Sequence, residues 1–248
     1  MAELVESSRD GNVALLRLNR PEARNALSPE LMEELASKLE RLDPDPEVRC
    51  LVIAGSDKVF AAGADIKAMS ERSFAEALRH PAASFWRRLA AIRTPLIAAV
   101  SGYALGGGCE LALACDMIVA AEGATFGQPE INLGIIPGFG GTQRLPRLVG
   151  EGRALEMNLT GTPIGGYDAC EYGLANDVVP DHELFDTSLR WARKMAQQAP
   201  LAIEKVKQVS GQGLDAEAQA FGEVFGSEDA KEGIGAFLGK RTPKFQGK

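Results

Sequence analysis

Histidine is scarce in this sequence, and paired cysteines are missing. The only two histidines among 248 residues, His80 and His182, lie far apart and outside any H-E-x-x-H motif or Cys/His cluster, so no metal site is expected. The four cysteines form no C-x-x-C pair, and buried, reduced thiols are expected. Catalysis that depends on a histidine base is therefore short of candidates. Any chemistry must fall to carboxylates and backbone groups.

Positive charge is in deficit, and long apolar runs are absent. With 27 Lys and Arg against 34 Asp and Glu, the formal net charge is −7 at pH 7. An acidic protein of this kind repels phosphate backbones. No stretch reaches about 18 uninterrupted apolar residues, and residues 1–8 lack the basic and apolar regions of a signal peptide. We expect a cytoplasmic protein that binds neither nucleic acid nor membrane.

The order of the predicted elements indicates an α/β fold with one large domain and a helical appendage. The predicted strands are residues 4–8, 12–19, 50–54, 95–100, 116–121 and 177–179. The predicted helices are residues 28–42, 82–93, 108–114, 151–159, 167–172, 183–198, 201–210, 214–225 and 227–238. Residues 71–81 have weak periodicity and are expected to be irregular.

The last predicted helices carry an apolar stripe that includes Phe221, Phe225 and Phe237. A helical layer that must bury such a face elsewhere suggests a docking or oligomer surface. We accordingly divide the chain into a core domain, residues 1–195, and a C-terminal helical region, residues 196–248.

A glycine-rich turn precedes the helix predicted at residues 108–114. Gly106, Gly107 and Gly108 follow an apolar segment, and Glu110 is the only charged residue between positions 97 and 115. Three glycines remove every Cβ, so a ligand can approach the backbone closely, and the N–H groups of the first helical turn point toward it. The turn therefore predicts an anion or oxyanion site.

Two further features repeat this pattern. Residues 61–64 form a loop of small residues that leads into a helix start at Asp65. Glu130 is the only charge between Glu122 and Arg144 and lies before a second glycine-rich stretch. A single buried glutamate most often caps a helix or completes a polar network. Two isolated carboxylates, each beside a glycine-rich bend, favour a pair that divides acid and base roles.

Nucleotide-binding loops are the rival interpretation of these glycines. A phosphate-binding loop needs a Lys after its last glycine, and none follows Gly108. A dinucleotide fingerprint would need glycine where Leu111 stands, or where Gln143 stands in the second stretch. Both alternatives fail at a residue that their chemistry requires.

Three ordered motifs resemble the crotonase, or enoyl-CoA hydratase/isomerase, family. They are AAGADIK at residues 61–67, GYALGGGCELA at residues 102–112 and FGQPEINLGIIPGFGGTQRL at residues 126–145. The likeness runs from residues 20–27 to residues 231–241, nearly the whole chain. It implies a spiral of strand-strand-helix units with a C-terminal helical region that trimerises, and homotrimers that often pair into homohexamers.

The resemblance also implies a reaction and its residues. The backbone N–H groups of Ala64 and Gly107 would form an oxyanion hole for the thioester carbonyl of trans-2-enoyl-CoA. Glu110 would activate water for attack at C3, and Glu130 would deliver a proton to C2, giving 3-hydroxyacyl-CoA. No cofactor is implied, since CoA is part of the acyl-CoA substrate.

The same resemblance suggests a substrate-binding surface. The segment from Ala62 to Lys67, which includes Ala64, Asp65 and Ile66, would line the CoA path. Lys58, Lys67 and Lys240 are candidate contacts for the phosphates or adenine, although each is equally an ordinary solvated lysine.

Other activities remain open within the family. Hydration needs two groups to manage a water and a proton, whereas a double-bond isomerase needs one base, so two carboxylates favour a hydratase over isomerase, decarboxylase or thioesterase relatives. A non-catalytic acyl-CoA-binding or RNA-binding module is the alternative from another class. Acyl-chain length depends on residues 68–80 and Phe139, and Trp86 is expected to pack rather than to contact substrate.

Overall fold

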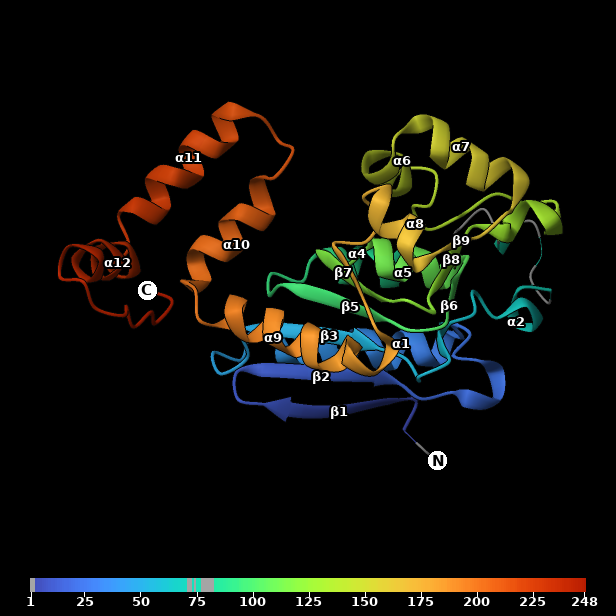
Figure 1. Cartoon of the computed structure of the whole chain (residues 1–248), viewed down its shortest axis with the longest axis horizontal. Coiled ribbons are helices and arrows are strands. Elements are labelled where there is room, and N and C mark those ends of the chain that lie inside the picture. Colours follow the sequence, from blue (N-terminus) through green and yellow to red (C-terminus); the bar gives the residue numbers. More distant parts are fainter. Residues whose placement is uncertain (1–2, 71–72, 74, 77–82) are drawn as a thin grey trace.

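The computed structural model describes residues 3–70, 73, 75–76 and 83–248. Two sheets form its centre (Figure 1). The larger sheet has the strand order β1(Val5–Asp10), β2(Val13–Leu18), β3(Cys50–Ala54), β5(Leu96–Val100), β7(Met117–Ala121) and β10(Asp177–Val179). Only β1 and β2 are antiparallel in this sheet, and every other neighbouring pair is parallel. The six strands predicted from the sequence are therefore confirmed, with ends that differ by one or two residues.

The apolar runs predicted as buried strands lie at the centre of this sheet. Every residue of β3 and of β5 is buried. Strands of a parallel sheet covered on both faces read as continuous hydrophobic runs, which is why no alternation is visible in their sequences. Helix α9(Leu184–Ala196) packs against β3, β5 and β7, and α1(Pro29–Leu42) packs against β1 and β2.

Local sequence signals fix where several helices begin. Ser28 Oγ accepts a hydrogen bond from the backbone N–H of Leu31 (3.3 Å), and Pro29 occupies the first helical position of α1. The remaining helices of the core are α2(Ile66–Ser70), α4(Ala83–Ala90), α5(Gly107–Leu113), α6(Arg144–Val149), α7(Glu151–Thr160) and α8(Gly166–Glu171). The irregular segment expected at residues 71–81 lies largely outside the described residues.

A second, smaller sheet was not predicted. It has the order β4(Val59–Ala61), β6(Tyr103–Leu105), β8(Thr125–Gly127) and β9(Ile164–Gly165). Strands of two or three residues are too short to show a period, so the sequence gives no signal for them. The strand directly before the glycine turn is therefore β6 rather than β5.

A glycine brings α5 against the smaller sheet. A Cβ on Gly108 would lie 2.0 Å from the carbonyl oxygen of Ala61, so only glycine permits this approach. The contact places the first turn of α5 beside the loop that follows β4. Gly107 and Ala64, which are far apart in the sequence, thereby become neighbours.

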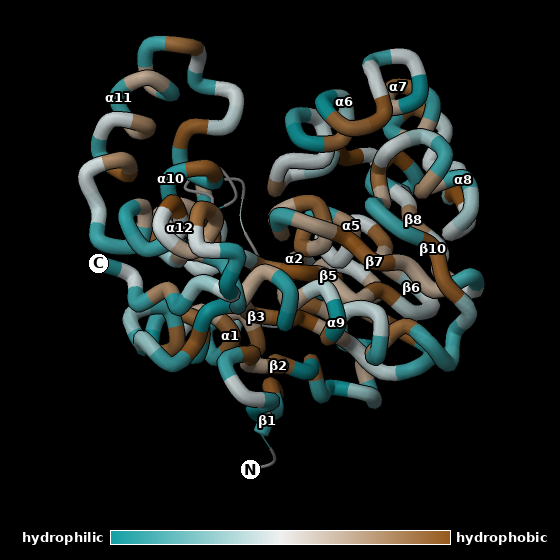
Figure 2. The backbone as a smooth tube through the Cα atoms, turned by 60° about the vertical axis from the view of Figure 1, so that its left-hand side comes forward, coloured by the Kyte–Doolittle hydropathy of each residue, from teal (hydrophilic) through white to brown (hydrophobic). Residues whose placement is uncertain are grey.

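Three helices follow the core: α10(Pro200–Val209), α11(Leu214–Phe225) and α12(Glu228–Leu238). They stand apart from both sheets (Figure 1), and hydrophobic positions recur along α10 and α11 (Figure 2). Phe221, Phe225 and Phe237 are all exposed, as the apolar stripe in the sequence predicts. None of the helices among the described residues has the length and apolarity needed to span a membrane.

Candidate active site

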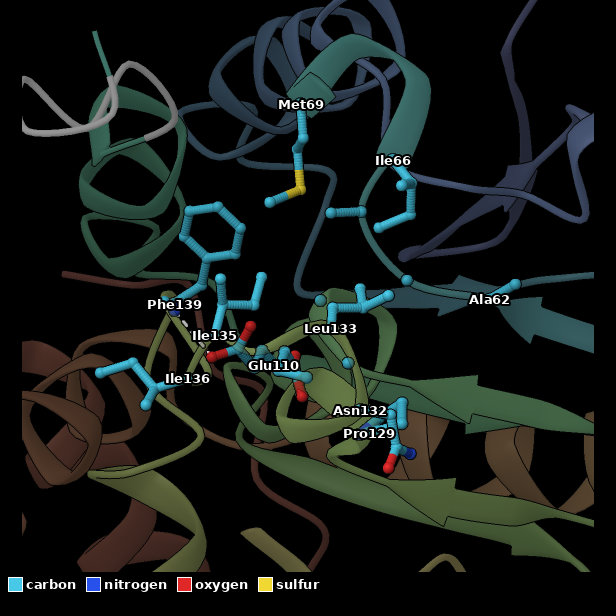
Figure 3. A pocket seen from close by; sticks show the side chains of 16 residues that line it. Ala62, Ile66, Met69, Glu110, Pro129, Asn132, Leu133, Ile135, Ile136 and Phe139 are labelled. Carbon is cyan, nitrogen blue, oxygen red and sulfur yellow. Dashed lines mark hydrogen bonds between the residues drawn. The ribbon is translucent and has the colours of Figure 1, made fainter. Parts of the chain in front are cut away.

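A cavity of about 440 Å³ lies beside the first turn of α5 (Figure 3). Its walls come from the loop after β4, from α2, from the first turn of α5 and from residues 129–139. The lining residues are Ala62, Gly63, Ala64, Ile66, Met69, Gly106, Gly107, Glu110, Pro129, Glu130, Asn132, Leu133, Ile135, Ile136, Gly138 and Phe139. Both predicted carboxylates and both predicted oxyanion residues therefore face one cavity.

Asp65 lies beside this cavity but not in its lining. Its carboxylate caps α2 by accepting from the N–H of Ala68 (3.1 Å) and pairs with Arg20 (2.8 Å). The Ala68 hydrogen bond and then Arg20 lower the pKa of the Asp65 carboxyl. Among the expected substrate contacts, Asp65 thus has a structural explanation that needs no ligand.

The three candidate lysines are all exposed. Lys58, Lys67 and Lys240 lie outside the cavity lining, and Lys240 follows the end of α12. Their role as phosphate or adenine contacts stays a prediction. Within the described ranges, no group of three or more His, Cys, Asp and Glu side chains is placed to hold a metal ion.

Glu110 is held by backbone hydrogen bonds. It is 1% exposed, in the first turn of α5. Its Oε1 atom accepts from the N–H of Phe139 (2.7 Å) and from the N–H of Gly141 (2.8 Å), and the first of these is drawn in Figure 3. Arg144 closes the same loop by donating to the carbonyl of Phe139 (2.7 Å). Such donors compensate the burial of the carboxylate and fix its orientation.

Glu130 has a different environment. It lies in a short 3-10 helix, Pro129–Leu133. Burial raises the pKa of its carboxyl to about 7, and the negative charge of Glu110 adds to the shift. The backbone of Gly106 is so close that a Cβ there would lie 2.8 Å from Glu130 Oε1. The cavity therefore holds one orientated carboxylate and one carboxyl that is partly protonated at neutral pH.

Gln128, which the sequence did not single out, contacts Glu130. Its side chain is fully buried. With its amide nitrogen facing Glu130, it donates to both carboxyl oxygens (3.2 and 3.1 Å). With its oxygen facing Glu130, it can accept from the protonated carboxyl instead. Gln128 can thus serve either charge state of Glu130, a role that no spacing rule in the sequence predicts.

Two backbone N–H groups face the same cavity. The N–H of Gly107 is the first of α5, where helices leave donors unused, and the cavity-lining loop supplies the N–H of Ala64. No hydrogen bond between described residues uses either donor. A Cβ on Gly107 would lie 3.3 Å from Ala64 N, so the two donors border one small space. This arrangement can hold an oxygen that carries negative charge.

Comparison with known proteins identifies the family. The family model described as enoyl-CoA hydratase/isomerase matches residues 8–248. The chain belongs to this family. It is 48% identical over 256 residues to 2,3-dehydroadipyl-CoA hydratase of Escherichia coli, with 100% of each chain covered. It is 42% identical over 246 residues to the mitochondrial enoyl-CoA hydratase of Pongo abelii, covering 96% of this chain and 85% of that one.

Solved structures confirm the expected crotonase fold. An enoyl-CoA hydratase subunit from Geobacillus kaustophilus superposes with a TM-score of 0.95 at 42% identity, and the alignment covers 100% of both chains. The enoyl-CoA hydratase of Bacillus anthracis gives a TM-score of 0.93 at 39% identity over 99% of this chain and 100% of that one. Several relatives that are 42–44% identical to the chain are named enoyl-CoA hydratase. The chain is therefore an enzyme of the enoyl-CoA hydratase class.

We expect Glu130→Gln to stabilise the protein more at pH 8 than at pH 5. A carboxyl whose pKa folding raises from 4.5 to about 7 contributes stability that is complete below the unfolded value and is lost as the pH rises through 7. Because solvent reaches Glu130 and weakens the effect, we expect the gain in the free energy of unfolding to be about 1–2 kcal/mol larger at pH 8 than at pH 5. Urea unfolding at both pH values and one protein concentration measures it.

The control is Glu156→Gln, which removes an exposed carboxylate on α7 that pairs with Arg153 (3.0 Å). It should change the free energy of unfolding by the same small amount at pH 5 and pH 8. If Glu130→Gln changes the free energy of unfolding by the same amount at pH 5 and pH 8, the raised pKa of Glu130 is contradicted.

Proposed function

We propose that this enzyme adds water to trans-2-enoyl-CoA thioesters and forms 3-hydroxyacyl-CoA. The observation that carries the proposal is the convergence of two carboxyl groups and two unused N–H donors on one cavity. The thioester oxygen would sit between the N–H groups of Ala64 and Gly107. Negative charge that develops on this oxygen is then met by donors already in place, which cost no reorganisation during the reaction.

Each carboxyl group then has one proton to move. Glu110, held by its two backbone hydrogen bonds, accepts a proton from the water whose oxygen bonds to C3. The electron pair of the double bond passes to the thioester oxygen as an enolate. Glu130, with a pKa of about 7, is partly protonated at neutral pH and gives its proton to C2. Exchange with solvent returns a proton from Glu110 to Glu130.

Two carboxyls in different environments favour hydration over the other activities of the family. A double-bond isomerase needs one base that returns the proton to the same substrate, and the second carboxyl would have no task. A non-catalytic acyl-CoA-binding or RNA-binding module would gain nothing from a buried carboxylate that costs free energy to desolvate.

The substrate contacts outside the reacting centre are also proposals. CoA would enter along residues 62–67, with Lys58, Lys67 and Lys240 available to its phosphates, and no cofactor beyond the substrate's own CoA is proposed. One relative is named for a dicarboxylic substrate, 2,3-dehydroadipyl-CoA. Among the described lining residues none is Lys, Arg or His, so we propose an uncharged acyl chain for this enzyme. A cytoplasmic location and a role in fatty acid metabolism remain predictions.

Glu110→Gln and Glu130→Gln should each lower kcat by a factor of at least about 10² with little change in KM, because each removes a proton transfer but keeps the shape of the cavity. Steady-state hydration of crotonyl-CoA, a four-carbon substrate, measures this. Glu156→Gln on α7 is the matched control and should retain wild-type rates. Full hydration activity of the Glu110 variant would contradict the two-carboxylate mechanism.

Gly107→Val should abolish turnover while the protein still folds. The side chain would stand 3.3 Å from Ala64 N, in the space assigned to the thioester oxygen. Loss of one such donor costs about 10²–10³ in rate, and steric exclusion should add to the loss. Gly152→Val, where no atom lies within 4 Å of the new Cβ, is the control. Wild-type kcat/KM in a folded Gly107 variant would place the oxyanion site elsewhere.

We further propose that the C-terminal region, residues 196–248, assembles the enzyme as a homotrimer or homohexamer. The exposed aromatic side chains of Phe221, Phe225 and Phe237 are an apolar surface that a partner subunit would cover. Light scattering should report three or six chains per particle. A monodisperse monomer at micromolar concentration would contradict the assembly.

A further inference from the structure

Two large apolar side chains, Phe139 and Met69, line the cavity away from Ala62 (Figure 3). Ala62 and Phe139 lie on opposite sides of Glu110, and Met69 projects toward Phe139 from α2 (Figure 3). If CoA enters past Ala62, as proposed above, the acyl chain must extend from the reacting carbons toward Phe139. Among the residues that the structure describes, Phe139 and Met69 lie where that path ends.

A second, much smaller apolar space lies behind these two side chains. It is lined by Leu27, Pro29 and Met32 near the start of α1, and by Ala68 of α2. Its remaining lining residues are Ala64, Asp65, Met69 and Phe139. Ala64, Met69 and Phe139 line the catalytic cavity as well. Phe139 and Met69 thus form a partition between the catalytic cavity and further apolar space against α1.

The ring of Phe139 is fixed on its outer face. It stacks on Trp86 of α4, with ring centroids 5.0 Å apart and planes at 20°, and Trp86 is buried. Helix α4 is in turn tied to α1, because Arg88 pairs with Glu33 (2.7 Å) and with Glu40 (2.7 Å). Moving the Phe139 ring aside would break its stacking on Trp86.

The backbone of Phe139 sets how close this partition lies to the reaction. Its N–H donates to Glu110 Oε1 at 2.7 Å, and Glu110 must reach the water that attacks C3. Because the same residue holds Glu110 and lines the cavity, an acyl chain that extends from C3 toward Phe139 meets this side chain.

From this geometry we propose that Phe139 and Met69 limit the acyl-chain length that the enzyme accepts, so that it prefers short chains to long ones. This inference rests on the proposed function for the position of the acyl group. One methylene too many in a tight apolar pocket costs about 10–200-fold in kcat/KM. The second space is only about 10 Å³, so the room for a longer chain would come mainly from the volume of the Phe139 or Met69 side chain that a substitution removes.

The experiment compares kcat/KM for trans-2-enoyl-CoA substrates of four, six, eight and ten carbons. For the wild type, the ten-carbon substrate should be at least about tenfold poorer than the four-carbon one. Phe139→Ala should raise the ratio of ten-carbon to four-carbon kcat/KM at least about tenfold, Phe139→Leu should do so less, and Met69→Ala should change it in the same direction. The backbone N–H that holds Glu110 remains in all three variants.

Met157→Ala is the matched control, since Met157 is buried on α7 and lines neither space. It should leave the ratio unchanged. Unchanged ratios in folded Phe139→Ala and Met69→Ala proteins, judged by circular dichroism, would overturn the proposal.

A binding measurement separates this inference from the proposed function. Calorimetric titration with butyryl-CoA and decanoyl-CoA, which cannot be hydrated, should show that Phe139→Ala gains affinity for the longer ligand relative to the shorter one by at least about tenfold. If the wild type hydrates no enoyl-CoA, the proposed function fails, and a shifted binding ratio still supports the partition. An unshifted binding ratio contradicts it whatever the activity.

Discussion

The site depends on two hydrogen bonds, from the N–H groups of Phe139 and Gly141 to the buried carboxylate of Glu110. A carboxylate at this depth is strongly disfavoured without donors, and here the donors come from backbone rather than from a cationic side chain. These donors stabilise the charged form of the carboxyl group and hold it in one orientation. The loop that supplies them is closed by Arg144 and continues into α6, which ties the geometry of the base to the packing of α6 against α5.

A second constraint is the close approach of α5 to β4 at Gly108. Two N–H groups from segments some forty residues apart can border one oxygen only if a helix end and a loop are pressed together, and a side chain at this contact would separate them. The smaller sheet pairs β4 with β6. This pairing keeps the loop after β4 beside the first turn of α5. Its strands are too short to add much stability of their own. Their effect is to position the loop after β4.

Sequence reasoning reached the strands of the larger sheet and the two carboxyl groups that line the cavity for identifiable reasons. Apolar runs buried on both faces and capped helices leave strong local signals, and an isolated charge such as Glu110 is conspicuous in an apolar run. Strands of two or three residues leave no period, and the partnership of Gln128 with Glu130 depends on side-chain orientation, which no spacing encodes. The family resemblance suggested Lys58, Lys67 and Lys240, but long solvated side chains do not have one position that a sequence could fix.

The backbone and the side chain of Phe139 make different contacts. The N–H that orientates Glu110 is present in every residue type except proline, whereas the ring that lines the cavity is a property of the side chain. Substitution there can change what the enzyme accepts and leave how it reacts untouched. If the proposed roles hold, a single substitution at this position can alter the range of substrates while the hydrogen bond to Glu110 is kept.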